Sequence, residues 1–232
     1  MTAVHTLTFR DDGLDDGMRE PLVRMTLVAE LVRAVGATEE DGLVALPAGF
    51  VQAPSVTARD QWAEGLLAAS RDAGVGLVFG IDVADEERWG IERCPRSFAF
   101  ACERGQRLLW ASPTARNRPG FTGRAVTFGA LRTVVLLGRE LFHAGARSLV
   151  DEKRPDLVLV MGHGGATAKW IQPLAALEAL APMLLVHQAL PQRRPVWTGP
   201  PRGWRATKAA GPLQVLSYRR EAVGATLPVV GN

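Results

Sequence analysis

Residues 131–161 read LRTVVLLGRELFHAGARSLVDEKRPDLVLVM, and this stretch contains the unit around which the rest of the fold is arranged. It opens and closes with runs that are almost wholly apolar, at 131–137 and 156–161, and such runs are typical of strands buried on both faces. The residues between these runs predict a helix over about 140–152. A strand, a helix and a second strand in this order indicate an α/β layer with helices packed outside a sheet.

The same alternation extends in both directions along the chain. Pro21 suits the first turn of a helix, and Gly36 and Gly74 suit helix ends. Strands are predicted at 4–9, 42–46, 75–82, 96–102, 107–110, 183–187, 204–208 and 213–218, and helices at 21–35, 57–73 and 168–180. Two similar halves predict one α/β domain over residues 1–232, a four-layer α-β-β-α sandwich in which helices cover two facing sheets.

Composition and charge exclude several classes of protein. With 47% hydrophobic and 22% charged residues, a chain of 232 residues suffices for one large globular core. No signal peptide is recognisable, and no window offers the ~20 apolar residues needed to span a bilayer, so we expect a cytoplasmic protein without a membrane partner. Two cysteines, Cys94 and Cys102, are too few for a disulfide framework or a Cys-based metal site. We expect neither a metal nor a cofactor, and we interpret Cys102 as a small buried thiol.

A basic segment lies at 191–220 in a chain whose net charge is only +3. No acid lies between Glu178 and Glu221, whereas this interval holds Arg193, Arg194, Arg202, Arg205, Lys208, Arg219 and Arg220, with Trp197 and Trp204 among them. One interpretation is a surface for nucleic acid or another polyanion. The other is that the segment faces the acidic stretches 11–20 and 39–41, or a neighbouring subunit. We favour the second, because no nucleic-acid-binding motif is present.

Four segments, taken in order and spacing, resemble the carbon–nitrogen hydrolase (nitrilase-like) superfamily. They are LVALPAGF at 43–50, RSFAFACERG at 96–105, TVVLLGRELF at 133–142 and PDLVLV at 155–160. The first is similar to the family's strand ending in Leu-Pro-Glu, the second to its Asn-Ser strand and Asp-Gly turn, and the third to its strand ending in Cys, an aromatic residue and an acid. Lys169 and Trp170, before an Ala/Leu-rich helix, resemble the segment that follows. The resemblance covers nearly the whole chain and implies that family's four-layer fold.

The resemblance also implies where a catalytic triad would stand. In that family a Cys thiolate attacks an amide or nitrile carbon, a Glu acts as general base and acid, and a Lys stabilises the developing charge. Here the Glu position is Ala48, the Cys position is Gly138, and the Lys position falls on Ser112 or Pro113. Removing one member of a catalytic unit often costs nearly as much rate as removing all. We therefore expect the inherited activity to be lost.

Three residues near these positions are candidates for ligand binding or relocated chemistry. Glu140 is either a substrate contact or base, or an acid at the positive end of a helix, the interpretation we favour. Arg139 is either an anion-binding residue at the same helix start or the partner of a nearby acid. His163, which follows a buried strand, is a base, a ligand or a plain loop residue. We interpret His143 as a packing or exposed residue and His187 as a core histidine.

Three hypotheses follow for the function. The first is a catalytically inactive relative that acts as a binding, regulatory or scaffold protein, forms a homodimer and has a small molecule or a protein as its partner. The second is a hydrolase of C–N bonds, or an enzyme of related chemistry, whose remodelled pocket uses Glu140 and His163. The third is a polyanion-binding module built on residues 191–220. We favour the first, because every triad position is replaced.

Overall fold

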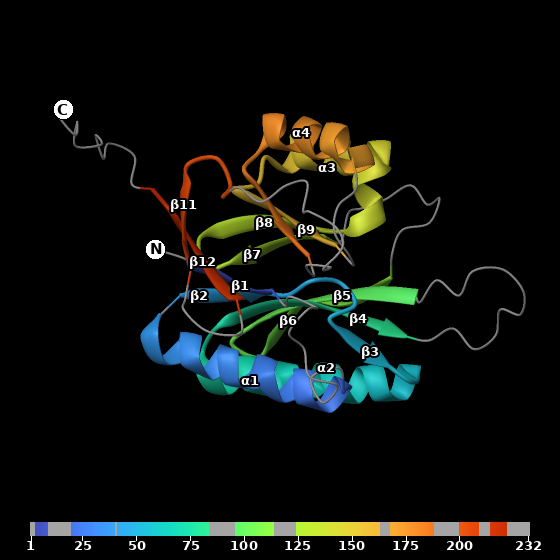
Figure 1. The fold of residues 1–232 in the computed structure, drawn as a ribbon, viewed down its shortest axis with the longest axis vertical. Coiled ribbons are helices and arrows are strands. Elements are labelled where there is room, and N and C mark those ends of the chain that lie inside the picture. Colours follow the sequence, from blue (N-terminus) through green and yellow to red (C-terminus); the bar gives the residue numbers. More distant parts are fainter. Residues whose placement is uncertain are drawn as a thin grey trace, which may run out of the picture.

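The computed structural model describes residues 3–8, 20–39, 41–83, 96–113, 124–162, 168–187, 200–208 and 214–221. Figure 1 shows four layers, with two β-sheets lying face to face between two layers of helices. The α-β-β-α sandwich predicted from the sequence is therefore confirmed. None of the helices in these residues is long and apolar enough to cross a membrane.

The first sheet combines strands from both ends of the chain with strands from its first half. These are β1 (Ala3–Thr8), β2 (Gly42–Ala45), β3 (Val51–Ala53), β4 (Gly76–Val83), β5 (Arg96–Glu103), β6 (Gln106–Pro113), β11 (Trp204–Lys208) and β12 (Gln214–Arg220). Their order is β11-β12-β1-β2-β4-β5-β6, and β3 pairs with β4 beside this path. Strands β1, β2 and β4 pair in parallel, whereas β5, β6 and β12 join antiparallel.

The second sheet is smaller and comes from one continuous part of the chain. Its strands are β7 (Ala125–Phe128), β8 (Leu131–Leu137), β9 (Leu157–Met161) and β10 (Met183–Val186), in the order β10-β9-β8-β7. Every residue of β9 and β10 is buried, as expected for parallel strands covered on both faces. The short strand β7, which pairs antiparallel with β8, forms one edge of this sheet.

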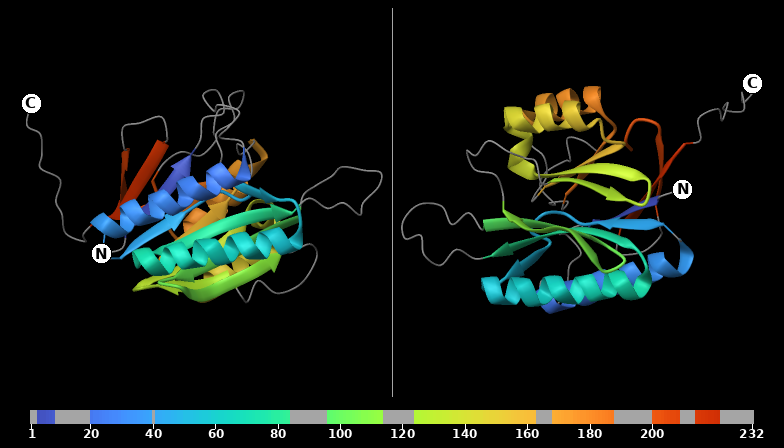
Figure 2. Two further views of the ribbon diagram at one scale, coloured as in Figure 1. Left: turned by 90° about the horizontal axis from the view of Figure 1, so that it is seen from below. Right: turned by 180° about the vertical axis from the view of Figure 1, so that it is seen from behind.

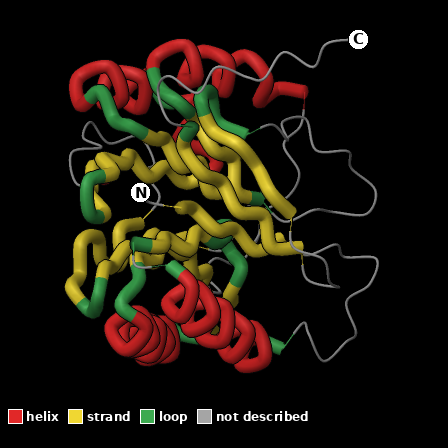
Figure 3. The backbone as a smooth tube through the Cα atoms, turned by 90° about the vertical axis from the view of Figure 1, so that its left-hand side faces the viewer, coloured by secondary structure: helices red, strands yellow, loops and turns green. Residues whose placement is uncertain are grey.

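The helices cover the outer faces of the sheets, as the two further views in Figure 2 and the tube in Figure 3 show. The α-helices are α1 (Pro21–Thr38), α2 (Val56–Ala73), α3 (Ala144–Lys153) and α4 (Ile171–Leu180). Two short 3-10 helices, η4 (Gly138–Phe142) and η5 (Ala168–Trp170), precede α3 and α4. Residues of α1 and α2 pack with the first sheet, and residues of α3 and α4 pack with the second.

The space between the two sheets is filled by side chains that alternate along each strand. In β4, Val78 belongs to the apolar cluster between the sheets, whereas its neighbours Leu77 and Phe79 belong to the cluster beneath α1 and α2. Val135 and Leu159 contribute to the same inner cluster from the second sheet. Because successive side chains on a strand point to opposite faces, the even-numbered residues of β4 face the second sheet.

Two of the three predicted helix-terminal residues are confirmed, and one is wrong. Pro21 is the first residue of α1, and Gly74 ends α2 in the left-handed conformation with φ 70°. Gly36 does not end α1, which continues to Thr38. A β-carbon on Gly36 would lie only 2.3 Å from the carbonyl oxygen of Ala73. The glycine is therefore required by the close approach of two helices and not by a change of chain direction.

The sequence-based prediction also missed two strands and misplaced one helix start. Strands β3 and β7 have three and four residues, too few to show a periodic pattern. The helix predicted over 140–152 begins only at Ala144, because the preceding residues form η4. His143 separates the two helices, and its Nδ1 accepts a hydrogen bond from the N–H of Gly145 at 3.2 Å. His143 thus caps α3, a role that we had not predicted.

Candidate functional site

Ala48, the position implied for a glutamate, lies at the interface between the two sheets. It follows β2 and is fully buried. A β-carbon built on Gly80 of β4 would lie 2.8 Å from Cα of Ala48 and 3.3 Å from Cε of Met161, the last residue of β9. Ala48 therefore sits between a neighbouring strand and the facing sheet, and it presents only a methyl group there.

Gly138, the position implied for the nucleophile, lies on the facing sheet, where β8 gives way to η4. A β-carbon on Gly138 would lie 3.4 Å from the carbonyl oxygen of Met161 and 3.6 Å from Cα of Gly162. Met161 thus adjoins both Gly138 and the Gly80–Ala48 contact. The structure brings the two implied triad positions to the same region, one from each sheet.

The tip of an indole ring lies beside the point where a side chain on Gly138 would begin. Cη2 of Trp170, in η5, lies 3.0 Å from the position of that β-carbon. The Trp170 ring is in turn met edge-on by the ring of Phe142, with 6.0 Å between centroids. Sequence matching placed Trp170 in a family-like segment but gave it no role. Only the tertiary structure shows that it fills the space beside Gly138.

The backbone at the implied lysine position belongs to the sheet whose strand β2 leads into Ala48. Ser112 pairs with Ala99 of β5, a residue of the cluster between the sheets. The ladder is irregular here, and Ala111 has a positive φ of 47°, which is sterically unfavourable for a residue other than glycine. Such bulges re-aim the strand beyond them. The side chains of Ser112 and Pro113 lie outside the part of the chain that the structure describes.

Glu140 is held by a buried ion pair and by a backbone hydrogen bond. One of its carboxylate oxygens lies 3.0 Å from Nη2 of Arg124, and the other accepts a hydrogen bond from the N–H of Leu137 at 2.8 Å. Glu140 and Arg124 are 1% and 3% exposed, so little solvent screens the pair. The carboxylate caps the first turn of η4, which supports the interpretation as a helix-start acid.

The remaining predicted candidates are only partly placed. The backbone of Arg139 lies in η4, but its side chain falls outside the described structure, as does all of His163. His187 follows β10 and is buried, with its Cβ lying 3.4 Å from where a β-carbon on Gly162 would stand. His187 therefore adjoins the region of Gly138, although the sequence suggested only a core histidine.

Asp82 is a buried acid that sequence reasoning did not single out. It lies on β4 directly opposite Ser97 of β5, and it is 1% exposed. Strand alternation places it on the same face as Gly80, toward the second sheet. The sequence did contain a signal, because a lone acid in the apolar run GLVFGIDV at 76–83 needs a reason to be buried.

Cys102 lies away from the Gly138 region, on the opposite face of the first sheet. It is fully buried in the cluster beneath α1 and α2, which confirms the prediction of a small buried thiol. Burial raises the pKa of this thiol to about 11, although a hydrogen bond with Ser70 acts in the other direction. Cys102 is therefore a neutral thiol at pH 7. Within the described residues, no group of three or more His, Cys, Asp or Glu is arranged to hold a metal ion.

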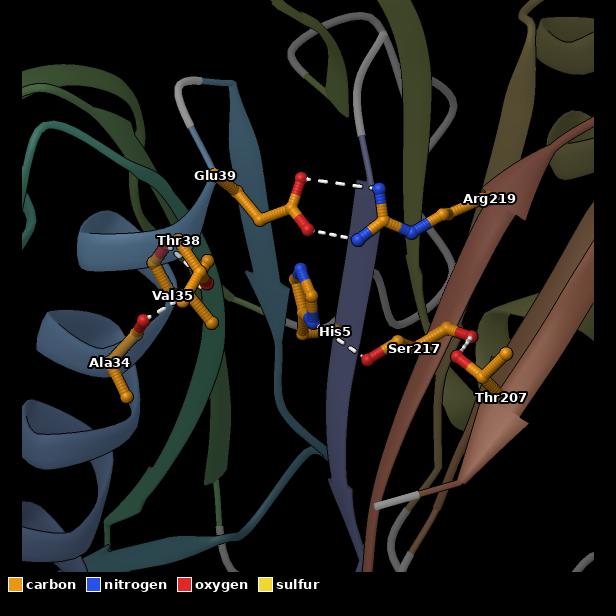
Figure 4. A network of polar contacts seen from close by, with 8 residues as sticks. All are labelled: His5, Ala34, Val35, Thr38, Glu39, Thr207, Ser217 and Arg219. Carbon is orange, nitrogen blue, oxygen red and sulfur yellow. Dashed lines mark hydrogen bonds and ion pairs between the residues drawn. The ribbon is translucent and has the colours of Figure 1, made fainter.

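Arginines of the basic segment form ion pairs with acids of the same chain. Arg219 pairs with Glu39 at the end of α1, and Arg220 lies 3.5 Å from Asp156. Figure 4 shows His5 between this Glu39–Arg219 pair and Ser217, whose Oγ is 2.9 Å from Nδ1 of His5. The contact with Glu39 agrees with the interpretation that the segment faces residues 39–41. Residues 191–199 and 209–213 of the segment lie outside the described structure.

Comparison with solved structures establishes the fold. The chain is similar to a glutamate-to-glutamine mutant of the amidase from Nesterenkonia sp. AN1 that carries acrylamide at its active-site cysteine, with a TM-score of 0.61, 15% identity and coverage of 94% of this chain and 93% of that one. It is also similar to NitN amidase from the same source, with a TM-score of 0.60, 14% identity and coverage of 96% and 94%. A cysteine-to-alanine mutant of that amidase is described as belonging to the nitrilase superfamily. It matches with a TM-score of 0.59 and 14% identity, over 93% of this chain and 89% of that one. No protein-family model and no curated protein matches the sequence.

Proposed function

We propose that this chain keeps a nitrilase-type fold without the amide- and nitrile-hydrolysing chemistry, and that it acts as a binding, regulatory or scaffold protein. The implied general-base position is Ala48 and the implied nucleophile position is Gly138. Neither residue carries a group that titrates or attacks carbon. Loss of both removes the covalent route and the proton transfers that it needs.

The observation that carries this proposal is the contact between Trp170 and Gly138. A nucleophilic side chain on residue 138 must extend past a β-carbon that already stands 3.0 Å from the indole. The tip of the indole therefore limits the room for a side chain at residue 138, which supports the proposal alongside the missing catalytic groups.

The placement of Glu140 weighs against its use as a relocated base. Its two oxygens are engaged by Arg124 and by the N–H of Leu137. A positive partner and a donated hydrogen bond both favour the charged carboxylate and weaken it as a proton acceptor. The contacts of Glu140 thus support a structural role at the start of η4.

Ammonia release from small amides tests the proposal. Cysteine mutants of the Nesterenkonia amidase have been solved in complex with acrylamide and with butyramide, so these two amides are the ones to test, and the intact amidase is the comparison enzyme. We expect ammonia production by this chain to equal that of buffer alone, while the control enzyme turns over. Ammonia release that scales with the concentration of this protein would contradict the proposal.

We further propose that the protein is a cytoplasmic homodimer, and we place the contact beside Trp170. Phe142 and Ile171 flank this residue and are 50% and 43% exposed. Adjacent exposed apolar side chains on a soluble protein often mark an interaction surface. A second copy of the chain would cover them and would hold the indole in place over Gly138.

Light scattering after gel filtration tests the dimer. We expect the wild-type chain to have twice the monomer mass and the double variant Phe142→Lys/Ile171→Lys to have the monomer mass. Val56→Lys is a matched control, because Val56 is 52% exposed on α2, beyond the opposite sheet. A monomeric wild-type protein, or a double variant that remains dimeric, would contradict this arrangement.

A further inference from the structure

His5 is a buried imidazole with one of its two ring nitrogens unpartnered. It lies on β1 opposite Ser217 of β12 and is 6% exposed. Its Nδ1 lies 2.9 Å from Oγ of Ser217, whereas its Nε2 is buried and has no hydrogen-bond partner among the described residues. A neutral imidazole carries a proton on only one nitrogen, but a protonated imidazole has two N–H donors. On protonation, one of the two nitrogens of His5 therefore lacks an acceptor.

Two charged groups act on this imidazole, the carboxylate of Glu39 and the guanidinium of Arg219. Glu39 directly follows α1, and Arg219 belongs to β12, where it pairs with Ala3 of β1. The two side chains form an ion pair, and Figure 4 shows it on the Nε2 side of the His5 ring. This ion pair therefore ties the end of α1 to β12 next to the unpartnered nitrogen.

The surroundings of His5 offer no second carboxylate among the described residues. Of the acids in this part of the chain, only Glu39 acts on the imidazole through its charge. Asp41, which precedes β2, and Arg205, on β11, form ion pairs with other residues. On β2, the partner of His5 is the apolar residue Val44. A second N–H on His5 thus has one carboxylate within its reach, and that carboxylate already binds Arg219.

The two cations that compete for Glu39 differ in their access to water. The side chain of Arg219 is 55% exposed, whereas that of Glu39 is 16% exposed and Nε2 of His5 is buried. Water replaces the carboxylate around an exposed guanidinium at little cost, so such an ion pair contributes little to stability. A buried cation without a partner is costly. A protonated His5 therefore gains more from the carboxylate than Arg219 loses.

We propose that His5 and the Glu39–Arg219 ion pair form a proton-controlled link between α1 and β12. With His5 neutral, Glu39 binds Arg219 and the link is closed, as in the structure. When Nε2 takes up a proton from solvent, the carboxylate of Glu39 turns to His5, and Arg219 is released to water. The end of α1 is then no longer tied to β12 through these side chains. This inference goes beyond the proposed function and does not depend on it.

Titration of the His5 ring by NMR between pH 8 and pH 5 tests whether Glu39 is the acceptor. The variant His5→Gln identifies the signal among those of the four histidines. We expect Glu39→Gln to lower the pKa of His5, because the charged ring loses its acceptor, and Arg219→Gln to raise it, because the competing cation is gone. Asp41→Asn is the matched control and should leave the pKa unchanged. An unchanged pKa in Glu39→Gln, or a His5 that stays neutral down to pH 5, would overturn the proposal.

Crystal structures at pH 7.5 and below the measured pKa of His5 test whether the carboxylate moves. We expect the Glu39–Arg219 contact at pH 7.5, and at the lower pH a hydrogen bond of about 2.7–2.9 Å from Nε2 of His5 to Glu39, with Arg219 released. The pair of Arg132 and Asp156 is the control and should be intact in both structures, because the pKa of Asp156 lies below 3.8. A charged His5 with Glu39 still bound to Arg219 would overturn the proposal.

Discussion

Trp170 and Gly138 are complementary in size: Cη2 of the indole lies 3.0 Å from the point where a β-carbon on the glycine would stand. A glycine in contact with the largest side chain keeps the packing dense. Each residue explains the other, since a larger residue at 138 would displace the ring and a smaller residue at 170 would leave a void. A β-carbon at residue 138 would therefore require the ring to move by a few tenths of an ångström.

The close contact between α1 and α2 predicts opposite effects for two glycine substitutions. Gly36→Ala places a β-carbon 2.3 Å from the carbonyl oxygen of Ala73, so one helix must move. We expect a loss of about 1–3 kcal/mol in the free energy of unfolding, measured by urea denaturation. Gly65→Ala is the control, because its β-carbon meets nothing within 4 Å. For Gly65→Ala we expect the free energy of unfolding to rise by about 0.5–1 kcal/mol, because alanine has a higher helix propensity than glycine. A Gly36→Ala protein as stable as the wild type would refute the close contact between α1 and α2.

The buried pair of Arg124 and Glu140 predicts a strongly non-additive double mutant. Arg124→Met leaves the carboxylate of Glu140 buried without this partner, and we expect a loss of about 3–5 kcal/mol in the free energy of unfolding. Adding Glu140→Leu removes the uncompensated charge. Chemical denaturation of both single variants and the double variant gives the interaction energy between the two side chains directly. Equal and additive losses would show that the two side chains do not act as a pair.

His5 predicts a loss of stability between neutral and mildly acidic pH. Burial lowers the pKa of His5 below 6.5, with Arg219 acting in the same direction and Glu39 opposing. The unfolded chain therefore binds the proton before the folded protein does. As pH falls from 7.5 through 6.5, the free energy of unfolding should fall by at most about 1.4 kcal/mol per pH unit on account of His5, and it should level off below the folded pKa.

The variant His5→Gln is the control for this pH dependence. We expect urea denaturation at pH 7.5 and 5.5 to show a smaller loss for the variant than for the wild type. Asp156 does not interfere in this range. Burial raises its pKa, but hydrogen bonds and charge from Arg132 outweigh this and hold the pKa below 3.8, so its contribution is lost only in stronger acid. Identical losses in both proteins would exclude His5 as the source.

Much of the fold was predictable because most elements have a periodic or continuous apolar pattern. The long strands β4 and β8 and the helix α2, which Gly74 ends, follow from local sequence alone. The strand β3 could not be predicted from local sequence, because three residues are too few to show a periodic apolar pattern. Its existence depends on pairing with β4. The role of Gly36 was mistaken for the same reason, since only the position of Ala73 explains it.

The candidate site was less predictable than the fold. The resemblance identified Ala48 and Gly138, which the structure brings to the same region through Met161. It did not identify Trp170, because a tryptophan before a helix has no local signature of filling a distant space. Asp82 was overlooked because it lies in a run that is otherwise apolar, and the sequence of this strand does not show which of its faces meets the second sheet.

Acrylamide labelling of a cysteine introduced at position 138 tests most directly whether the indole occupies the nucleophile's place. We would compare Gly138→Cys with Gly138→Cys/Trp170→Ala and follow the tryptic peptide of residues 133–139 by mass spectrometry, with labelling in urea as the reference for an accessible thiol. We expect the single variant to stay unlabelled while folded, because the new side chain must share its space with Trp170, and the double variant to be labelled. Labelling of the folded single variant at the rate seen in urea would show that Trp170 does not close this position.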